Sequence, residues 1–197
     1  MGNDPMTVDA AANGVQARLD QARRSIDAHA RLVPDFPEPG VAFKDLTPVL
    51  AAPDGLRAVT AALADACAGA ELIAGIDARG FLLGGAVAHH LGVGVVAVRK
   101  GGKLPPPVVG VDYDLEYGSA RLEVPASGIE FAGRRIAVVD DVLATGGTLC
   151  ATLDLFNQVG AKVSDVAVVM ELSGFPGRPR LEAAGGGAVR VHNLCEG

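Results

Sequence analysis

The feature that most constrains the fold of this chain is one continuous run, residues 136–148, which reads as a strand, a turn and the start of a helix. Its apolar first part, residues 136–139, is typical of a strand buried on both faces. The strand is expected to end in Asp140 and Asp141, and a turn rich in glycine and threonine follows. A strand that runs into a helix in this way predicts an α/β fold, with a parallel sheet flanked by helices.

Short apolar strands and helices alternate through the rest of the chain in the same manner. Strands are expected at 71–76, 93–98, 135–139, 163–172 and 189–194, with an extended piece at 41–46 and a hairpin at 112–115 and 120–124. Helices are expected at 15–31, at 54–68 with Asp54 as its N-cap, at 81–91 and at 147–159, and residues 174–187 form a loop or a short helix.

The length of 197 residues favours one domain, over residues 15–197, after a disordered extension at 1–14. A proline-rich segment at about 33–46 forms a small N-terminal hood before the sheet. The formal net charge of −6 argues against nucleic-acid binding, and no apolar run is long enough to span a bilayer. Three widely spaced cysteines form no disulfide or metal pattern, so we expect a cytoplasmic protein.

The turn after the two aspartates has the chemistry of a phosphate site. Gly146 and Gly147 let the backbone approach a ligand closely, and Thr145 and Thr148 add hydroxyl donors beside the N-terminus of the helix. Asp140 and Asp141 are carboxylates that suit the two neighbouring hydroxyls of a sugar. The pattern therefore indicates a sugar phosphate, and the alternative is a glycine-rich turn whose Asp and Thr residues only cap the helix.

Three further segments carry charged groups whose roles stay open from the residues alone. Asp77, Ala78 and Arg79 follow an apolar strand, where Asp77 is either a cap or part of an anion site and Arg79 is either a surface pair or an anion ligand. Residues 99–105, with Arg99, Lys100 and Lys103, form either a solvated turn or the start of a mobile cationic lid over residues 100–110. Glu116 in a hairpin turn is ordinarily a solvated side chain.

Residues 136–148 resemble the phosphoribosyl pyrophosphate (PRPP) motif of the type I phosphoribosyltransferases. The resemblance implies that Asp140, Asp141 and the loop from Ala144 to Thr148 bind PRPP. It also implies that Asp77, Ala78 and Arg79 form a pyrophosphate loop, with a non-proline cis peptide after Asp77 in many members. Arg99, Lys100 and Lys103 match the family's Arg-Lys-x-Gly-Lys-Leu-Pro lid, and Arg79 and Lys103 would stabilise the departing pyrophosphate.

The same resemblance implies a purine site. Residues 36–45 are similar to the base-binding hood, in which Phe43 stacks on adenine, the backbones of Ala42 and Lys44 read its edge, and Leu172 closes the other face. Residues 113–118 resemble the motif in which a catalytic glutamate, here Glu116, handles the proton at purine N7, and Tyr117 lies near the reaction centre and PRPP.

The implied activity converts adenine and PRPP to AMP and pyrophosphate, in purine salvage, in a homodimer. The resemblance implies Mg²⁺ held mainly by PRPP oxygens and water, with no firm protein ligand. A 6-oxopurine substrate and a PRPP-sensing regulator of the same fold are the alternatives. The sequence departs from the family at Asp114, which replaces a serine, at the run of prolines 105–107, and over residues 173–197.

Overall fold

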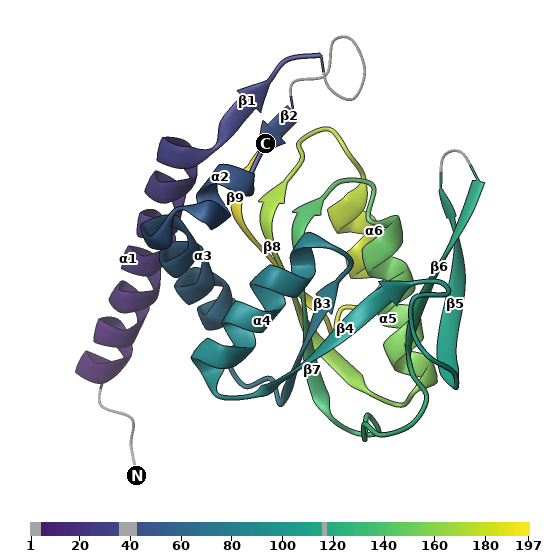
Figure 1. Cartoon of the computed structure of the whole chain (residues 1–197). Helices are drawn as coiled ribbons and strands as arrows, with labels where there is room; N and C mark the ends of the chain where they lie inside the picture. Colours follow the sequence, from purple (N-terminus) through teal and green to yellow (C-terminus); the bar gives the residue numbers. More distant parts are fainter. Residues whose placement is uncertain (1–4, 36–42, 116–117) are drawn as a thin grey trace.

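The computed structural model describes residues 5–35, 43–115 and 118–197, and the side chains of all of these except 5–11 and 115. A seven-stranded sheet runs through the molecule in the order β5-β6-β4-β3-β7-β8-β9 (Figure 1). Its strands are β3 (Leu72–Ile76), β4 (Gly94–Lys100), β5 (Val108–Leu115), β6 (Gly118–Pro125), β7 (Arg135–Leu143), β8 (Lys162–Glu171) and β9 (Arg190–Glu196). Neighbours from β4 to β9 are parallel, whereas β6 is antiparallel to β4 and β5. The predicted α/β fold is confirmed.

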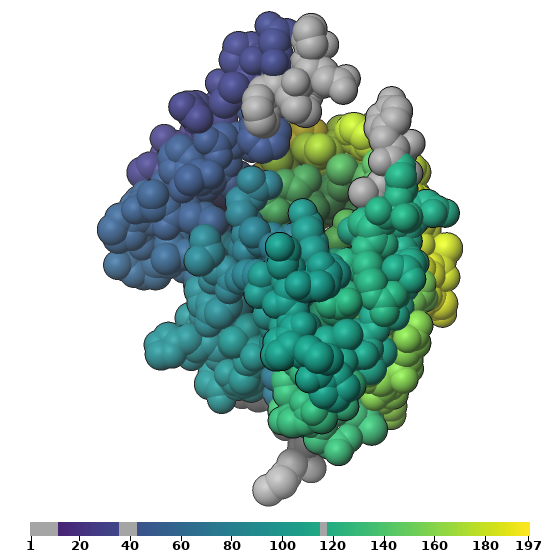
Figure 2. Space-filling model, turned by 45° about the vertical axis from the view of Figure 1, so that its right-hand side comes forward, coloured from purple at the N-terminus to yellow at the C-terminus, as the bar shows by residue number. Residues whose placement is uncertain are grey.

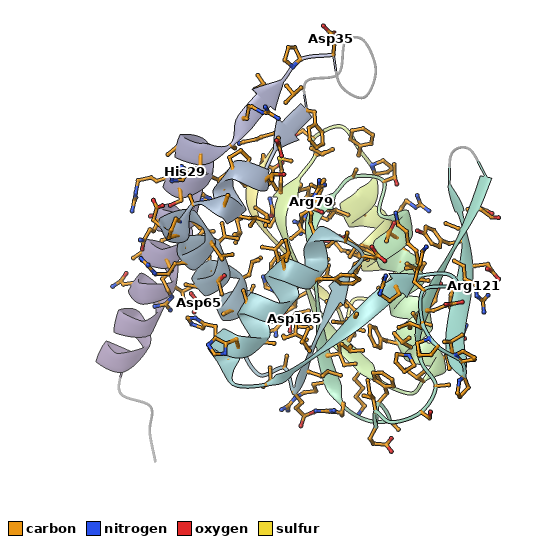
Figure 3. All side chains as sticks on the ribbon, viewed as in Figure 1. His29, Asp35, Asp65, Arg79, Arg121 and Asp165 are labelled. Atoms are coloured by element: carbon orange, nitrogen blue, oxygen red, sulfur yellow. The ribbon has the colours of Figure 1, made fainter. Side chains whose placement is uncertain are left out.

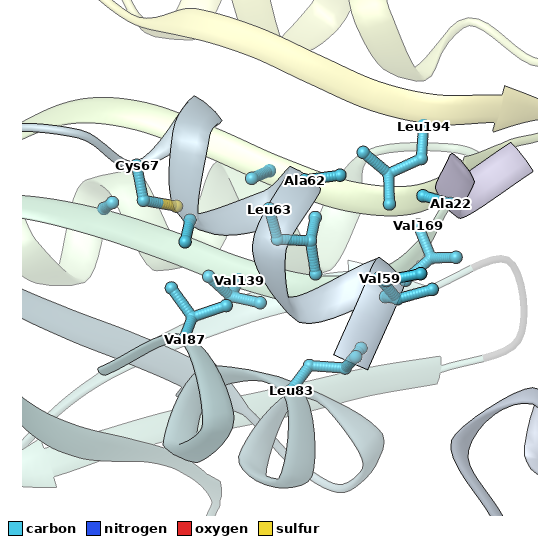
Figure 4. Packing of buried hydrophobic residues seen from close by; sticks show 14 of the residues in the cluster. Ala22, Val59, Ala62, Leu63, Cys67, Leu83, Val87, Val139, Val169 and Leu194 are labelled. Atoms are coloured by element: carbon cyan, nitrogen blue, oxygen red, sulfur yellow. The ribbon is translucent and has the colours of Figure 1, made fainter. Parts of the chain in front are cut away.

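Two hydrophobic clusters cover the two faces of this sheet. The helices are α1 (Pro5–His29), α2 (Thr47–Ala51), α3 (Pro53–Ala66), α4 (Arg79–Leu91), α5 (Gly147–Gln158) and α6 (Gly177–Ala184). Along β7, Ala137 and Val139 face the cluster formed with α1, α3 and α4, in which Leu63 and Val87 also pack (Figure 4). Ile136 and Val138 face α5 and α6, because successive side chains of a strand point to opposite faces.

The N-terminal part of the chain differs from the prediction. Helix α1 begins at Pro5, ten residues before the predicted start at residue 15, and reaches into the segment expected as an N-terminal extension. The alanines at 10–12 favour helix, and proline is accepted in a first helical turn. Strand β2 (Phe43–Asp45) lies inside the extended piece predicted at 41–46. Its antiparallel partner β1 (Arg31–Val33) was not predicted and lies at the start of the expected hood.

The N-cap assignment is also corrected. Helix α3 begins at Pro53 with Ala52 as its N-cap, so Asp54 lies inside the first turn. There its carboxylate pairs with His29 of α1, with Oδ2 3.1 Å from Nε2. The preceding helix α2 was not predicted, since it is only one turn long; the Asp45 carboxylate accepts a hydrogen bond from the Thr47 backbone N–H at its start.

Strand β7 continues through Leu143, four residues beyond the predicted end. The longer strand β8 supplies partners there, with Asp140 opposite Val168 and Leu143 opposite Glu171. Strand β5 likewise begins at Val108, inside the predicted loop. The two aspartates therefore lie within a paired strand, which fixes their backbone rigidly. No helix of the described chain is long and apolar enough to cross a bilayer.

Candidate active site

A cavity of about 510 Å³ lies at the carboxyl ends of β3 and β7, where α/β sheets bind ligands. Figure 2 shows the molecule hollowed at this end. The turn after β3, the end of β4, the β5–β6 hairpin, β7 and the start of α5 all contribute to its wall. The lining residues are Asp77, Ala78, Arg79, Lys100, Tyr113, Ala120, Leu122, Asp140, Asp141 and Thr148.

The turn between β3 and α4 lies close to β7 because two glycines permit it. A Cβ atom on Gly75 would lie 2.3 Å from the Gly80 carbonyl oxygen, and one on Gly80 would lie 2.7 Å from the Val139 carbonyl oxygen. Glycine at both positions lets the chain turn directly against the sheet. The Asp77–Ala78 peptide in this turn is cis, as the resemblance implied.

Two arginine–carboxylate pairs involve residues of the cavity wall. The Nε of Arg79 donates to the Asp141 carboxylate, and the Nε of Arg99 lies 3.1 Å from Oδ2 of Asp77 (Figure 3 labels Arg79). The Arg99 guanidinium also lies 5.3 Å from the centre of the Phe81 ring, within cation–π range. Arg79 and Arg99 are therefore each held in place by a carboxylate of the cavity wall.

The two aspartates of β7 have different surroundings. Burial, and then the neighbouring charge of Asp141, raise the pKa of Asp140 well above its ordinary value. Oδ1 of Asp140 accepts the backbone N–H of Asp141 at 2.9 Å, while Asp141 pairs with Arg79. A carboxyl that retains its proton can donate as well as accept, which suits a ligand hydroxyl.

Beside this cavity, the predicted phosphate loop encloses a second hollow of about 120 Å³. Gly146 has a positive φ of 79°, a conformation that glycine adopts readily, and α5 begins at the next residue. The structure brings together every predicted residue of the loop: Ala144, Thr145, Gly146, Gly147 and Thr148. Unpaired N–H groups at the start of a helix bind anions, so the loop is suited to a phosphate.

Comparison with known proteins identifies the family. The family described as "Phosphoribosyl transferase domain" matches residues 48–180. The adenine phosphoribosyltransferase of Mycolicibacterium vanbaalenii is 67% identical over 152 residues, which are 77% of this chain and 87% of that protein. The chain belongs to the adenine phosphoribosyltransferase family.

Solved members of the adenine phosphoribosyltransferase family share the fold. The enzyme from Rhodothermus marinus has a TM-score of 0.79 and 44% identity, covering 89% of this chain and 98% of that one. The enzyme from Thermoanaerobacter pseudethanolicus has a TM-score of 0.80 and 39% identity, covering 88% of this chain and 99% of that one. The Nocardia farcinica adenine phosphoribosyltransferase is 55% identical over 166 residues, which are 84% of this chain and 87% of that protein.

The remaining residues expected from the adenine phosphoribosyltransferase resemblance are spread more widely. Lys103 is exposed in the β4–β5 turn and Arg99 points to Asp77, so neither lines the large cavity, whereas Lys100 does. Phe43 and Lys44 lie half-buried in β2, and Nζ of Lys44 is 3.6 Å from Oδ1 of Asp27 on α1. The predicted residues Ala42, Glu116 and Tyr117 lie outside the described residues.

Leu172 directly follows β8. Its backbone N–H donates to the Leu143 carbonyl at 2.9 Å, so this predicted adenine contact lies beside the end of β7 and the start of the phosphate loop. Its half-buried side chain packs on the cluster beneath α1 and α3.

Three residues that the sequence did not single out line this adenine phosphoribosyltransferase site or contact the loops around it. Tyr113 lines the cavity, with its hydroxyl 3.4 Å from Oγ1 of Thr148. The Glu123 carboxylate accepts the backbone N–H of Gly102 at 2.9 Å. Arg180 donates to the Thr145 carbonyl. Only Tyr113 had a signal, since it lies in the Tyr-Asp-Leu-Glu-Tyr-Gly segment; the other two meet their partners only in the fold.

Proposed function

We propose that this chain transfers the phosphoribosyl group of PRPP to adenine, which gives AMP and pyrophosphate and serves purine salvage. The observation that carries the proposal is the convergence of three kinds of group on one cavity. The turn after β3 and Lys100 offer cationic groups, Asp140 and Asp141 offer carboxyls, and Thr148 joins the cavity to the phosphate loop. PRPP has a matching pyrophosphate, vicinal diol and 5-phosphate.

The proposed roles follow the order of these groups in space. Arg79 and Lys100, with the backbone at Asp77 and Ala78, bind the pyrophosphate, and Arg99 and Lys103 complete the cationic side. Asp140 and Asp141 bind the ribose hydroxyls, while residues 144–148 hold the 5-phosphate. Since Arg79 pairs with Asp141, both partners exchange that ion pair for contacts with ligand when PRPP enters. Pyrophosphate binding therefore frees Asp141 for the ribose.

The proposed reaction breaks the bond from ribose C1 to the pyrophosphate oxygen and forms a bond from C1 to adenine N9. Arg79 and Lys103 stabilise the negative charge that develops on pyrophosphate, which is where electrostatic catalysis acts. Adenine loses a proton when it becomes a nucleotide base, and Glu116 is proposed to handle it through N7. Tyr117 is proposed to lie against PRPP beside the reacting carbon.

Adenine is proposed to bind between the hood and the end of β8. Phe43 supplies the stacking face from β2, Ala42 and Lys44 supply backbone hydrogen bonds, and Leu172 closes the opposite face. The position of Leu172 beside Leu143 supports this arrangement, because it puts the base site next to the end of the strand that carries Asp140 and Asp141. A mismatched 6-oxo group would leave polar groups unpaired there.

Mg²⁺ is proposed as the cofactor, and the residues present suit an ion that is held mainly by the substrate. Among the described residues, no group of three or more His, Cys, Asp or Glu side chains is placed to hold a metal ion. Asp77 and Asp141 are already paired with arginines. PRPP oxygens and water would therefore supply most ligands, as Mg²⁺ accepts in phosphate sites. When bound, Mg²⁺ supplies charge neutralisation on the pyrophosphate.

A cytoplasmic homodimer that binds neither membrane nor nucleic acid completes the proposal. The formal net charge of −6 supports the absence of a nucleic-acid partner. Sedimentation of the purified protein tests the dimer, which predicts twice the chain mass of 20.0 kDa.

The decisive experiment mixes the protein with PRPP, Mg²⁺ and one purine base at a time, and follows nucleotide and pyrophosphate. We expect AMP and pyrophosphate in equal amounts from adenine, and a kcat/KM for hypoxanthine, guanine or xanthine at least about 100-fold lower. The double variant Asp140→Asn with Asp141→Asn serves as a control, since it should weaken PRPP binding more than adenine binding in calorimetric titrations. Preference for a 6-oxopurine, or PRPP binding without turnover, would contradict the proposal.

A further inference from the structure

The start of helix α6 packs directly against the back of the phosphate loop. Gly177 is buried there, and a Cβ atom on it would lie 2.1 Å from the Ala144 carbonyl oxygen and 2.7 Å from Cδ1 of Leu143. A Cβ atom on Gly146 would lie 2.9 Å from the Gly177 carbonyl oxygen. The two backbones therefore touch at a distance that only glycine allows on either side.

Two carbonyls of the loop face α6 on this outer side, and the next one is bonded within α5. The Ala144 carbonyl faces Gly177, and the exposed side chain of Arg180 donates from Nη1 to the Thr145 carbonyl at 2.9 Å. The Gly146 carbonyl accepts the backbone N–H of Cys150 at 2.9 Å, within the first turn of α5. Three consecutive carbonyls are thus directed toward α6 or α5 and away from the hollow.

Because the peptide unit is planar, the directions of these carbonyls also determine the directions of the N–H groups that follow them. In a trans peptide the carbonyl of one residue and the N–H of the next point in opposite directions. Carbonyls of residues 144, 145 and 146 that point outward therefore aim the N–H groups of Thr145, Gly146 and Gly147 inward. Successive inward N–H groups form a concave anion site, here the hollow of about 120 Å³.

We propose that α6 sets the geometry of the 5-phosphate site, with Arg180 and Gly177 as positioning residues. This inference rests on the proposed function, in which residues 144–148 bind the phosphate of PRPP. Arg180 holds the Thr145 carbonyl outward and so keeps the Gly146 N–H aimed at the phosphate, while Gly177 leaves room for the Ala144 carbonyl to do the same for Thr145. Neither residue touches the ligand; both act through the loop.

The test compares two probes that occupy different halves of the PRPP site: ribose 5-phosphate and pyrophosphate. Calorimetric titration of Arg180→Met is expected to show ribose 5-phosphate binding about tenfold weaker, with pyrophosphate binding changed less than twofold. In steady state, KM for PRPP should rise and KM for adenine should stay unchanged. Arg180→Lys, which can still donate to the carbonyl, should restore at least half of the lost affinity on a logarithmic scale.

Arg24→Met is the matched control, because Arg24 is an exposed arginine on α1 and its loss changes the net charge equally. It should leave both probes unaffected. Gly177→Ala gives a second measurement, expected to weaken ribose 5-phosphate further, with thermal unfolding recorded to confirm that the variant is folded. Ribose 5-phosphate affinity of Arg180→Met within twofold of wild type, or equal weakening of both probes, would overturn the inference. Wild-type protein that binds neither PRPP nor ribose 5-phosphate would instead contradict the proposed function.

Discussion

At the scale of single residues, Asp140 is placed where a carboxylate is costly. It lies in a paired strand, largely out of water and next to a second carboxyl, so its pKa is raised first by burial and then by Asp141. Two adjacent acids at this position do not improve the fold. Their cost to stability is understandable if they bind the ribose hydroxyls, as proposed, because sites for function often oppose stability.

This cost can be measured by its pH dependence. Because the folded-state pKa of Asp140 is raised, its favourable contribution to folding is present below the ordinary value of 3.8 and is lost as pH rises through the folded pKa. We predict that Asp140→Asn gains stability relative to wild type as pH increases. Urea unfolding between about pH 4 and pH 8 checks this. Asp154→Asn, a change at an exposed position of α5, is the control and should show no such trend. If the unfolding free energies of wild type and Asp140→Asn change in parallel with pH, the raised pKa of Asp140 is contradicted.

A second prediction concerns Glu116, which stands between β5 and β6 in the sequence. Glutamine keeps the shape of glutamate but does not exchange a proton in the same way. Glu116→Gln should therefore leave folding and PRPP affinity nearly intact and slow the chemical step by about 10²–10⁴-fold. Single-turnover rates are the proper measurement, since product release can hide the chemical step in kcat. A rate within about threefold of wild type would mean that Glu116 is a solvated side chain.

Residues that are neighbours in sequence were the ones that the sequence could predict. Asp140, Asp141 and the loop 144–148 form one continuous strand–turn–helix unit, so local pattern alone places them together. Arg180 is 35 residues from Thr145, and Glu123 is 21 residues from Gly102. Such contacts depend on how α6 and the hairpin pack, which no local pattern specifies.

At the scale of elements, the turn between β4 and β5 is anchored at its base. The Gly101 N–H donates to the Arg121 carbonyl at 2.9 Å, and the Gly102 N–H donates to Glu123, whose carboxylate also pairs with Arg121 (Figure 3 labels Arg121). The mobile lid predicted over residues 100–110 is therefore too long, because residues 108–110 belong to strand β5. The segment from Lys103 to residue 107 is the part left to move.

We predict that PRPP protects this segment from trypsin. Lys103 is exposed and followed by leucine, so it is a cleavable site in the free protein. Binding of its ammonium group to pyrophosphate should slow cleavage there several-fold, while cleavage at the exposed Arg57 on α3 should not change. Glu123→Gln weakens the anchor at Gly102 and should speed cleavage at Lys103 in the free protein. Equal cleavage at Lys103 with and without saturating PRPP would count against a lid.

Elements were predicted well where a sustained apolar period defined them, and poorly where it did not. The strands of the central sheet and helices α4 and α5 were found within a few residues, because each buries an apolar face. The short elements β1, β2 and α2 have no such period, and only β2 lies in a segment that was predicted to be extended. Strand β1 exists because β2, more than ten residues later, pairs with it. Strand β7 was predicted too short for the same reason, since β8 extends it.

At the scale of the whole molecule, the two ends of the sheet have different tasks. The carboxyl ends of β3 and β7 hold the cavity, whereas the opposite end of β8 holds a cluster of charged groups around one buried carboxylate. Asp165, labelled in Figure 3, is fully buried there. Its carboxylate accepts hydrogen bonds from Nε and Nη2 of Arg190 at 2.8 and 3.0 Å, and Nε2 of His192 lies 3.0 Å from Oδ1. Burial raises the pKa of Asp165, but the hydrogen bonds from Arg190 and His192 outweigh it and lower the pKa below its ordinary value.

We therefore predict that Arg190→Met reduces stability without reducing activity. A carboxylate with a lowered pKa contributes stability above its ordinary range, and that contribution is lost as pH falls through the folded-state value. The variant should lose about 1–3 kcal/mol of unfolding free energy at neutral pH, because a buried carboxylate loses the hydrogen bonds from Arg190. The loss is limited to this range because His192 remains as a hydrogen-bond partner. The difference from wild type should shrink as the pH falls below the ordinary Asp value of 3.8, because Asp165 becomes protonated. Urea unfolding measures both effects, and Arg24→Met again controls for net charge.

Below the unfolding transition, kcat and both KM values should match wild type, since the cluster lies at the end of the sheet away from the cavity. If the KM for PRPP of Arg190→Met changes under conditions where the variant is fully folded, the two ends of the sheet are coupled and the prediction is contradicted.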